Sequence, residues 1–249
     1  MYATKLVLFA SFFLCVTHAD LEKKVPVTVY YESLCPDSKK FFTTQLYPSL
    51  QTNLSKWVNL TLVPYGKSNV TEMGMEWQFS CHHGPFECQG NKIQACALNE
   101  IEKTTPKSVD QGFNKITLAF INCLMDKTEK KKDVAGSDEY VFPVEECSKI
   151  NQVQNSADID NCSRHTTGSK LLADLGAKTR NFQSYLTSVP TIVFNEKYDA
   201  KESQASQSNF VKVLCGYITK DKPEECNGCG LKSTVSLLLI AIAFVNLFL

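Results

Sequence analysis

The chain has 249 residues, and its 26 basic and 26 acidic side chains give a formal net charge of zero. This balance excludes the strongly basic surface typical of nucleic-acid-binding proteins, so we expect no nucleic-acid partner. The hydrophobic fraction of 43% is ordinary, but eleven cysteines are many for this length, and their meaning depends on the compartment.

The first 19 residues have the pattern of a secretory signal peptide. Lys5 precedes an apolar run over residues 6–16, and a short segment ending in Ala19 supplies the predicted cleavage site. The run is shorter than the roughly 20 residues that a membrane span needs. Because secretion exposes the chain to an oxidising compartment, its cysteines predict disulfides rather than zinc sites. Four Asn-x-Ser/Thr sequons agree with secretion and predict N-glycans at Asn53, Asn59, Asn69 and Asn161.

The C-terminal segment, residues 227–249, is a second targeting signal. Residues 235–249 are almost entirely apolar, but they would span only about 22 Å of a hydrocarbon core of about 30 Å. Small residues and a short polar spacer precede them, which is the pattern of a GPI attachment signal with its site at or near Asn227. A tail-anchored membrane span and an unprocessed tail are the alternatives.

Between these ends, residues 20–226 are predicted to form the folded domain. Residues 25–31 are β-branched and aromatic, which predicts a buried strand. Pro36 suits a first helical turn because it has no amide hydrogen to donate. Residues 58–66 predict a second strand, and strand, helix and strand in one sheet predict a right-handed βαβ unit.

The rest of the domain completes an α/β pattern. Residues 70–187, approximately, show helical patches and no clear strands, and we interpret them as a largely helical, disulfide-tied insertion. Residues 188–195 predict a strand that opens at Pro190, and residues 210–217 predict a final helix. This order, with Cys-Pro at the first helix and Pro-Thr at a later strand, predicts a thioredoxin-like fold.

Cys35-Pro36-Asp37-Ser38 is the segment that indicates chemistry. Cys35 is predicted at a helix N-terminus, where free amides and the helix dipole favour a thiolate, the attacking species in disulfide exchange. Ser38 stands where a two-thiol site has its second cysteine; it cannot displace a bound substrate, but it can donate a hydrogen bond to the thiolate. Pro190 is the predicted partner, although only about 5–6% of X-Pro bonds are cis and the sequence leaves its geometry open.

Residues 81–96 hold three cysteines and two histidines. A zinc site could be drawn from them, but the compartment and the cysteine spacings favour disulfides, and we expect no metal or other cofactor. The segment resembles the signature of the gamma-interferon-inducible lysosomal thiol reductase family, Cys-Gln-His-Gly-x2-Glu-Cys-x2-Asn-x4-Cys, with His82 in place of glutamine. Further similarity lies in Val189-Pro190 and in residues 211–215 and 222–226.

The resemblance covers roughly residues 25–226 and implies a thioredoxin-like reductase with a helical insertion. Such an enzyme opens disulfides of protein substrates in endosomes or lysosomes or outside the cell, with a role in antigen processing or host defence. Cys35 aligns with the nucleophile of the family, whereas Ser38 stands at the resolving cysteine, so an external small thiol is the expected reductant. The alternative is a catalytically weak or inactive, surface-anchored binding glycoprotein on the same scaffold.

Cysteine arithmetic links the two ends of the chain. Signal removal leaves ten cysteines, and nine remain when Cys35 is set aside. Cleavage near Asn227 would remove Cys229 and leave an even set whose connectivity stays open: Cys81, Cys88, Cys96, Cys123, Cys147, Cys162, Cys215 and Cys226. A Cys226–Cys229 pair is the alternative.

Overall fold

The computed structural model describes residues 24–74, 76–131 and 139–227. The predicted signal peptide, the apolar tail and Cys229 lie outside these residues. Within the described ranges, no helix is both long enough and apolar enough to cross a bilayer.

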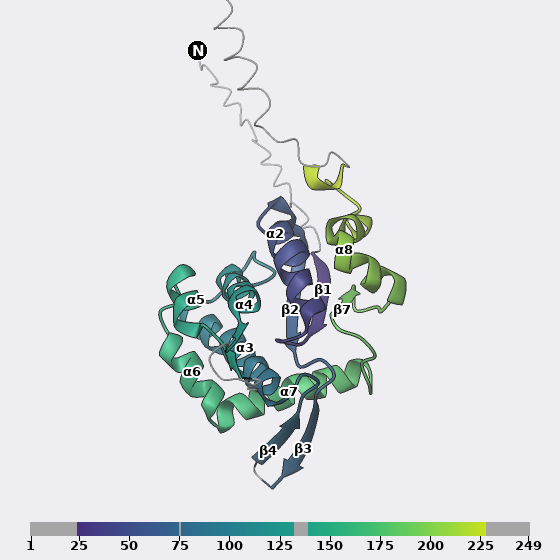
Figure 1. Ribbon diagram of the computed structural model, residues 1–249. Helices are drawn as coiled ribbons and strands as arrows, with labels where there is room; N and C mark the ends of the chain where they lie inside the picture. The colour runs from purple at the N-terminus through teal and green to yellow at the C-terminus, as the bar shows by residue number, and fades with distance from the viewer. Residues whose placement is uncertain (1–23, 75, 132–138, 228–249) are drawn as a thin grey trace, which may run out of the picture.

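A three-stranded sheet forms the centre of the fold (Figure 1). Strand β1 (Val25–Tyr31) lies in the middle, with β2 (Val58–Pro64) parallel on one side and β7 (Thr191–Phe194) antiparallel on the other. The side chains of Val25, Val27 and Val29 are buried, as expected for a β-branched run in a central strand. The strands predicted from residues 25–31 and 58–66 are therefore present.

A continuous helical segment connects β1 to β2. It consists of α1 (Pro36–Phe41), one π-helical turn η1 (Phe42–Leu46) and α2 (Tyr47–Leu50), followed by the short 3-10 helix η2 (Asn53–Trp57). Because β1 and β2 are parallel, this segment is the crossover of the predicted βαβ unit. The mixed α/β, thioredoxin-like fold is confirmed.

The last helix, α8 (Ala200–Tyr217), packs against the sheet through aromatic rings. Phe210 lies with its ring centroid 5.8 Å from Phe41 on α1 and 6.1 Å from Phe194 on β7. Buried aromatic pairs of this kind contribute stability beyond the area they bury. A disulfide from Cys215 to Cys226 then ties α8 to the 3-10 helix η3 (Glu224–Cys226).

Helices α3 to α7 form the insertion, a separate group beside the sheet in Figure 1. Their bounds are Pro85–Thr104 for α3, Lys115–Lys127 for α4, Val144–Ile150 for α5, Ser156–Arg164 for α6 and Thr166–Phe182 for α7. Three disulfides tie this part of the chain: Cys81–Cys88, Cys96–Cys162 and Cys123–Cys147. All eight cysteines that were predicted to form disulfides are thus paired with one another.

The expectation that the insertion lacks strands was wrong. A hairpin of β3 (Asn69–Met73) and β4 (Glu76–Ser80) projects from the domain, and two-residue strands β5 (Glu129–Lys130) and β6 (Tyr140–Val141) form a second pair. Most side chains of the first hairpin are exposed. Its strands do alternate polar and apolar residues, as in Glu76-Trp77-Gln78-Phe79-Ser80, but each is only five residues long and its apolar side chains are at most partly buried.

Candidate active site

Cys35 caps the N-terminus of the helical segment that begins with α1. Its backbone is extended, with φ −67° and ψ 123°, and its carbonyl accepts the first helical bond from Lys39 N at 2.9 Å. Pro36 occupies the first helical position, as predicted. The Cys35 side chain therefore lies at the positive end of the helix dipole, as the sequence predicts.

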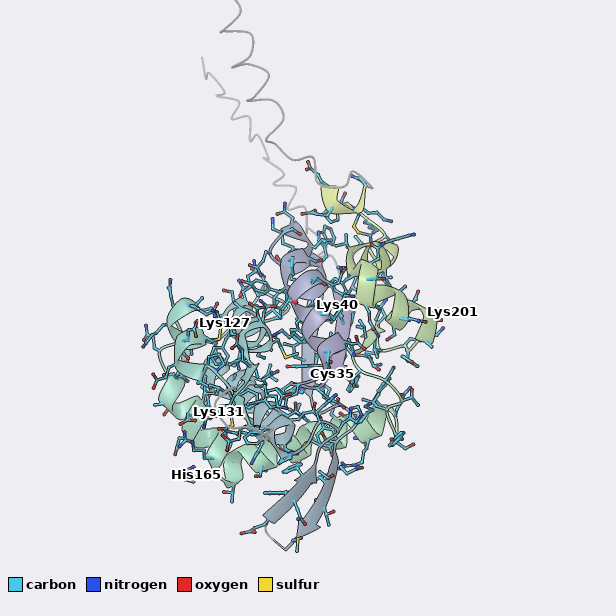
Figure 2. The ribbon with its side chains drawn as sticks, in the orientation of Figure 1. Cys35, Lys40, Lys127, Lys131, His165 and Lys201 are labelled. Carbon is cyan, nitrogen blue, oxygen red and sulfur yellow. A yellow bond between two sulfur atoms is a disulfide. The ribbon has the colours of Figure 1, made fainter. Side chains whose placement is uncertain are left out.

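Figure 2 shows Cys35 at the start of this helical segment, and its side chain belongs to a small apolar cluster. Its side chain is 6% exposed, and its Sγ lies 3.7 Å from the carbonyl oxygen of Val189, which is placed to accept the thiol hydrogen. Val189 and Pro190 are joined by a cis peptide bond. The structure thus brings together Cys35 and Pro190, which are separated by more than half of the chain.

Ser38 lies one turn into the same helix and is fully buried. Its Oγ accepts a hydrogen bond from the backbone N–H of Glu32 at 3.5 Å. Since the oxygen is the acceptor in this bond, the hydroxyl proton is left to donate to another group. Among the described residues Cys35 is the free cysteine, so no second thiol stands at the site in that part of the chain.

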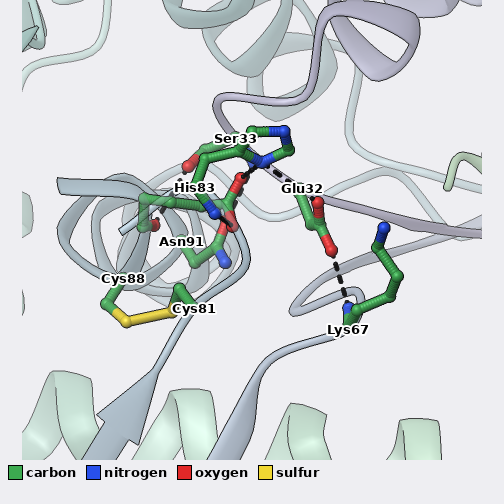
Figure 3. The surroundings of a disulfide bond; sticks show 8 residues. Glu32, Ser33, Lys67, Cys81, His83, Cys88 and Asn91 are labelled. Carbon is green, nitrogen blue, oxygen red and sulfur yellow. Dashed lines mark hydrogen bonds and ion pairs between the residues drawn. A yellow bond between two sulfur atoms is a disulfide. The ribbon is translucent and has the colours of Figure 1, made fainter. Parts of the chain in front are cut away.

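The loop between β1 and α1 is held by helix α3 (Figure 3). Asn91 Oδ1 accepts a hydrogen bond from Ser33 N at 2.9 Å, and the carbonyl of Glu87 accepts one from Ser33 Oγ at 3.1 Å. Asn91 and Glu87 are both fully buried. Two positions of the signature segment therefore fix the backbone that leads into Cys35.

Two histidines and two buried carboxylates gather beside this loop. Nδ1 of His83 lies 2.5 Å from Oε2 of Glu87 and 3.3 Å from Oε2 of Glu32, and Nδ1 of His82 lies 3.2 Å from the same Glu32 oxygen. Burial raises the pKa of Glu87, and the neighbouring Glu32 charge raises it further, while hydrogen bonds and charge from His83 act in the opposite direction. Lys67 N donates to the other Glu32 oxygen, Oε1, at 2.7 Å.

Sequence reasoning missed Glu32 and Ser33. Neither residue belongs to a recognisable motif, and their partners on α3 and before it are fifty or more positions away in the chain. The sequence signal that could have found Glu32 is its place directly after a predicted buried strand, where a charge needs a partner.

The predicted glycosylation sites are surface positions, and one of them, Asn69, pairs with Ser80 in the hairpin that leads to His82. The side chains of Asn53, Asn59, Asn69 and Asn161 are all exposed, and glycosylation there stays a prediction. Asn227, the predicted GPI attachment site, is exposed directly after η3, and its attachment role also stays a prediction.

Comparison with known proteins decides the family. The family model described as gamma interferon inducible lysosomal thiol reductase (GILT) matches residues 26–163, more than half of the chain. The chain belongs to this family. GILT-like protein 1 of Drosophila melanogaster is 41% identical over 90% of this chain and 87% of its own length, and a GILT-like protein of Anopheles gambiae is 40% identical over 82% and 81%.

More distant relatives carry the same family name. The gamma-interferon-inducible lysosomal thiol reductase of Carassius auratus is 30% identical over 84% of this chain and 74% of its own length. Among solved structures, the crystal structure of Chlamydia trachomatis DsbA superposes with a TM-score of 0.44 at 13% identity, covering 84% of this chain and 97% of that one. Membership of the GILT family supports thiol–disulfide oxidoreductase chemistry.

Proposed function

We propose that this GILT family member reduces protein disulfides through one thiol, Cys35, and that an external small thiol completes the cycle. The observation that carries the proposal is the pairing of a free Cys35 at a helix N-terminus with Ser38, one turn on, in the place of a second cysteine. The helix end supports the thiolate, and the serine removes the internal route of release.

The reaction balances in three exchanges. The Cys35 thiolate attacks a substrate disulfide, forms a mixed disulfide with one substrate sulfur and releases the other as a thiolate. A small thiol such as glutathione then attacks the substrate sulfur of the mixed disulfide and restores the Cys35 thiolate. A second small thiol reduces the substrate–glutathione disulfide, so two small thiols are oxidised for each substrate disulfide that is reduced.

Several finer features belong to the proposal. Its substrates are disulfide-containing proteins, and no cofactor beyond the small thiol is required. The location is the secretory route, with the lysosome or endosome, the cell surface and the exterior as destinations. A role in antigen processing or host defence follows from the family resemblance and stays a prediction.

The test is reduction of a disulfide-linked, fluorescence-quenched peptide at a fixed protein concentration and increasing glutathione. We expect the rate to increase with glutathione and to vanish without it, because nothing else releases the mixed disulfide. In Cys35→Ser the rate should fall to that of glutathione alone. A Cys35→Ser rate equal to that of wild type would refute the proposal.

The absence of a second thiol among the described residues also favours a second candidate, a binding protein that keeps its partners as mixed disulfides. Mass spectrometry of the reaction without glutathione distinguishes the two. Adducts on Cys35 that persist when glutathione is added indicate capture, whereas adducts that disappear as reduced peptide accumulates indicate catalysis. If iodoacetamide fails to modify Cys35 in the folded protein, neither thiol-based function holds.

A further inference from the structure

We propose that Glu32, His82 and His83 form a binding site for a divalent transition-metal ion, for which Zn²⁺ has the best-matched chemistry. The three side chains each present one ligand atom, and these atoms all lie within 4.8 Å of one another. Two imidazoles and a carboxylate are a donor set that zinc binds in proteins, with the fourth position left to water or a further ligand.

The spacing of the donor atoms fits a tetrahedral ion. Zinc bonds of about 2.0 Å to nitrogen and oxygen place neighbouring ligand atoms about 3.3 Å apart. Glu32 Oε2 lies 3.2 Å from Nδ1 of His82 and 3.3 Å from Nδ1 of His83. Two edges of the tetrahedron are therefore already present.

The charge of the cluster also fits a divalent cation. Glu32 and Glu87 are both fully buried, and their Oε2 atoms meet at His83. Their remaining oxygens are occupied by backbone amides, from Lys67 at 2.7 Å and from His83 at 3.0 Å. With neutral imidazoles, two buried carboxylates carry two negative charges, which one divalent ion balances. Buried charges of this kind are otherwise costly.

The loop that carries both histidines is held in place. His82 and His83 lie between β4 and α3, and the Cys81–Cys88 disulfide joins the two ends of this turn (Figure 3). Their side chains are 47% and 31% exposed, so an ion can enter from solvent, whereas Glu32 lies beneath them with no exposure. A rigid loop over a buried carboxylate reduces the entropy lost on binding.

Lys67 is the group that opposes the ion. Its Nζ lies 3.2 Å from Nε2 of His82, which therefore accepts the bond while Nδ1 carries the ring proton. When a metal replaces the proton on Nδ1, the proton of the neutral ring moves to Nε2 and the lysine must leave. Removal of the Lys67 amine is therefore expected to leave zinc affinity unchanged or to strengthen it.

The test is zinc binding by isothermal titration in the Cys35→Ser background, which removes the free thiol as a competing ligand. We expect one Zn²⁺ per chain, bound at least about tenfold more weakly in His82→Gln and in Glu32→Gln. His165→Gln, which changes a histidine outside the cluster, is the matched control and should bind as the parent does. Lys67→Met should bind at least as tightly. Cobalt(II) absorption in the visible range, intense for tetrahedral sites, gives a second readout.

His82→Gln introduces the residue of the family signature at an exposed position, so it tests ligation with little risk to folding. Thermal unfolding in EDTA, identical for parent and variant, verifies this. No binding by the parent, binding that survives both His82→Gln and Glu32→Gln, or weaker binding in Lys67→Met would each overturn the proposal. Since the background lacks Cys35, these outcomes are independent of the reductase assay.

Discussion

The sulfur of Cys35 lies 3.7 Å from the carbonyl oxygen of Val189, although 154 positions separate the two residues. The contact joins the N-terminus of the first helix to the segment that leads into β7, the neighbour of β1 in the sheet. It places the free thiol beside a backbone carbonyl and one helical turn from Ser38, which we propose stands in the place of a second cysteine. The first prediction follows from that replacement.

Ser38→Cys should convert the site to two thiols. Residue 38 lies one helical turn from Cys35, so a thiol there attacks the mixed disulfide intramolecularly. In a single turnover without glutathione, with reduced protein in excess over substrate, we expect Ser38→Cys to release reduced peptide at least about tenfold faster than wild type, because intramolecular attack has a high effective concentration and the two protein thiols are oxidised to a disulfide with each other. Ser38→Ala is the control and should not gain. Release by Ser38→Cys that still requires glutathione would contradict the prediction.

The disulfide that closes the longest loop should contribute most to the free energy of unfolding. Cys96–Cys162 closes a loop of sequence separation 66, whereas Cys215–Cys226 closes one of 11. Loop-closure entropy predicts losses of about 4 and about 3 kcal/mol when each pair is replaced by alanine. Urea unfolding of the two double variants measures both. A larger loss from the shorter loop would show that contacts, not chain entropy, dominate.

Gly112→Ala should destabilise the fold. A Cβ at this position would lie 1.9 Å from the carbonyl oxygen of Val58 and 2.8 Å from the Cα of Asn59, both of which are backbone atoms of β2. Because backbone cannot yield as a side chain does, we expect a loss of about 1–3 kcal/mol. Gly216→Ala, on α8 with nothing within 4 Å, is the control and should be neutral or stabilising by about 0.5–1 kcal/mol.

The Tyr217 hydroxyl should ionise at a higher pH than an ordinary tyrosine. Burial, followed by its hydrogen bond to the Glu202 carboxylate, raises its pKa to about 12. The folded state then holds a proton that the unfolded chain has lost, so the stability from this group is full below the ordinary pKa of 10.0 and is lost as pH rises toward 12. Absorbance at the phenolate band, compared between wild type and Tyr217→Phe, measures the pKa. Glu202→Gln should lower it, and an unchanged value would contradict the assigned contact.

The sequence predicts the sheet well because most residues of its strands are buried. The β1 strand lies at the predicted residues, since a β-branched run has few other stable environments, and β7 begins at Thr191, directly after the predicted opening proline. The exposed β3–β4 hairpin has no such pattern and was missed. Family membership, inferred from one 16-residue segment, is confirmed by a match over residues 26–163.

The candidate site could be predicted only where its chemistry is local. Cys35, Ser38 and the helix start share one short motif, so their relation follows from helix geometry. The meeting of Glu32 with His82 and His83 depends on how α3 packs beside β1, and no local pattern encodes a contact of that range. Disulfide pairing is equally non-local, and for the same reason the eight cysteines gave no connectivity.

The helical segment that connects β1 to β2 places the Cys35 thiol at one end of the domain. Cys35 lies at one end of the segment that runs from Pro36 to Leu50, a length of roughly 20 Å. Beyond the other end, Asn53 N donates to Glu225 Oε1 at 3.2 Å. This bond holds η3, the last element before Asn227, at the opposite end of the segment from Cys35 (Figures 1 and 2). If the chain is anchored through Asn227, the point of attachment and the Cys35 sulfur would therefore lie toward opposite ends of this segment, and the thiol would not adjoin the anchor.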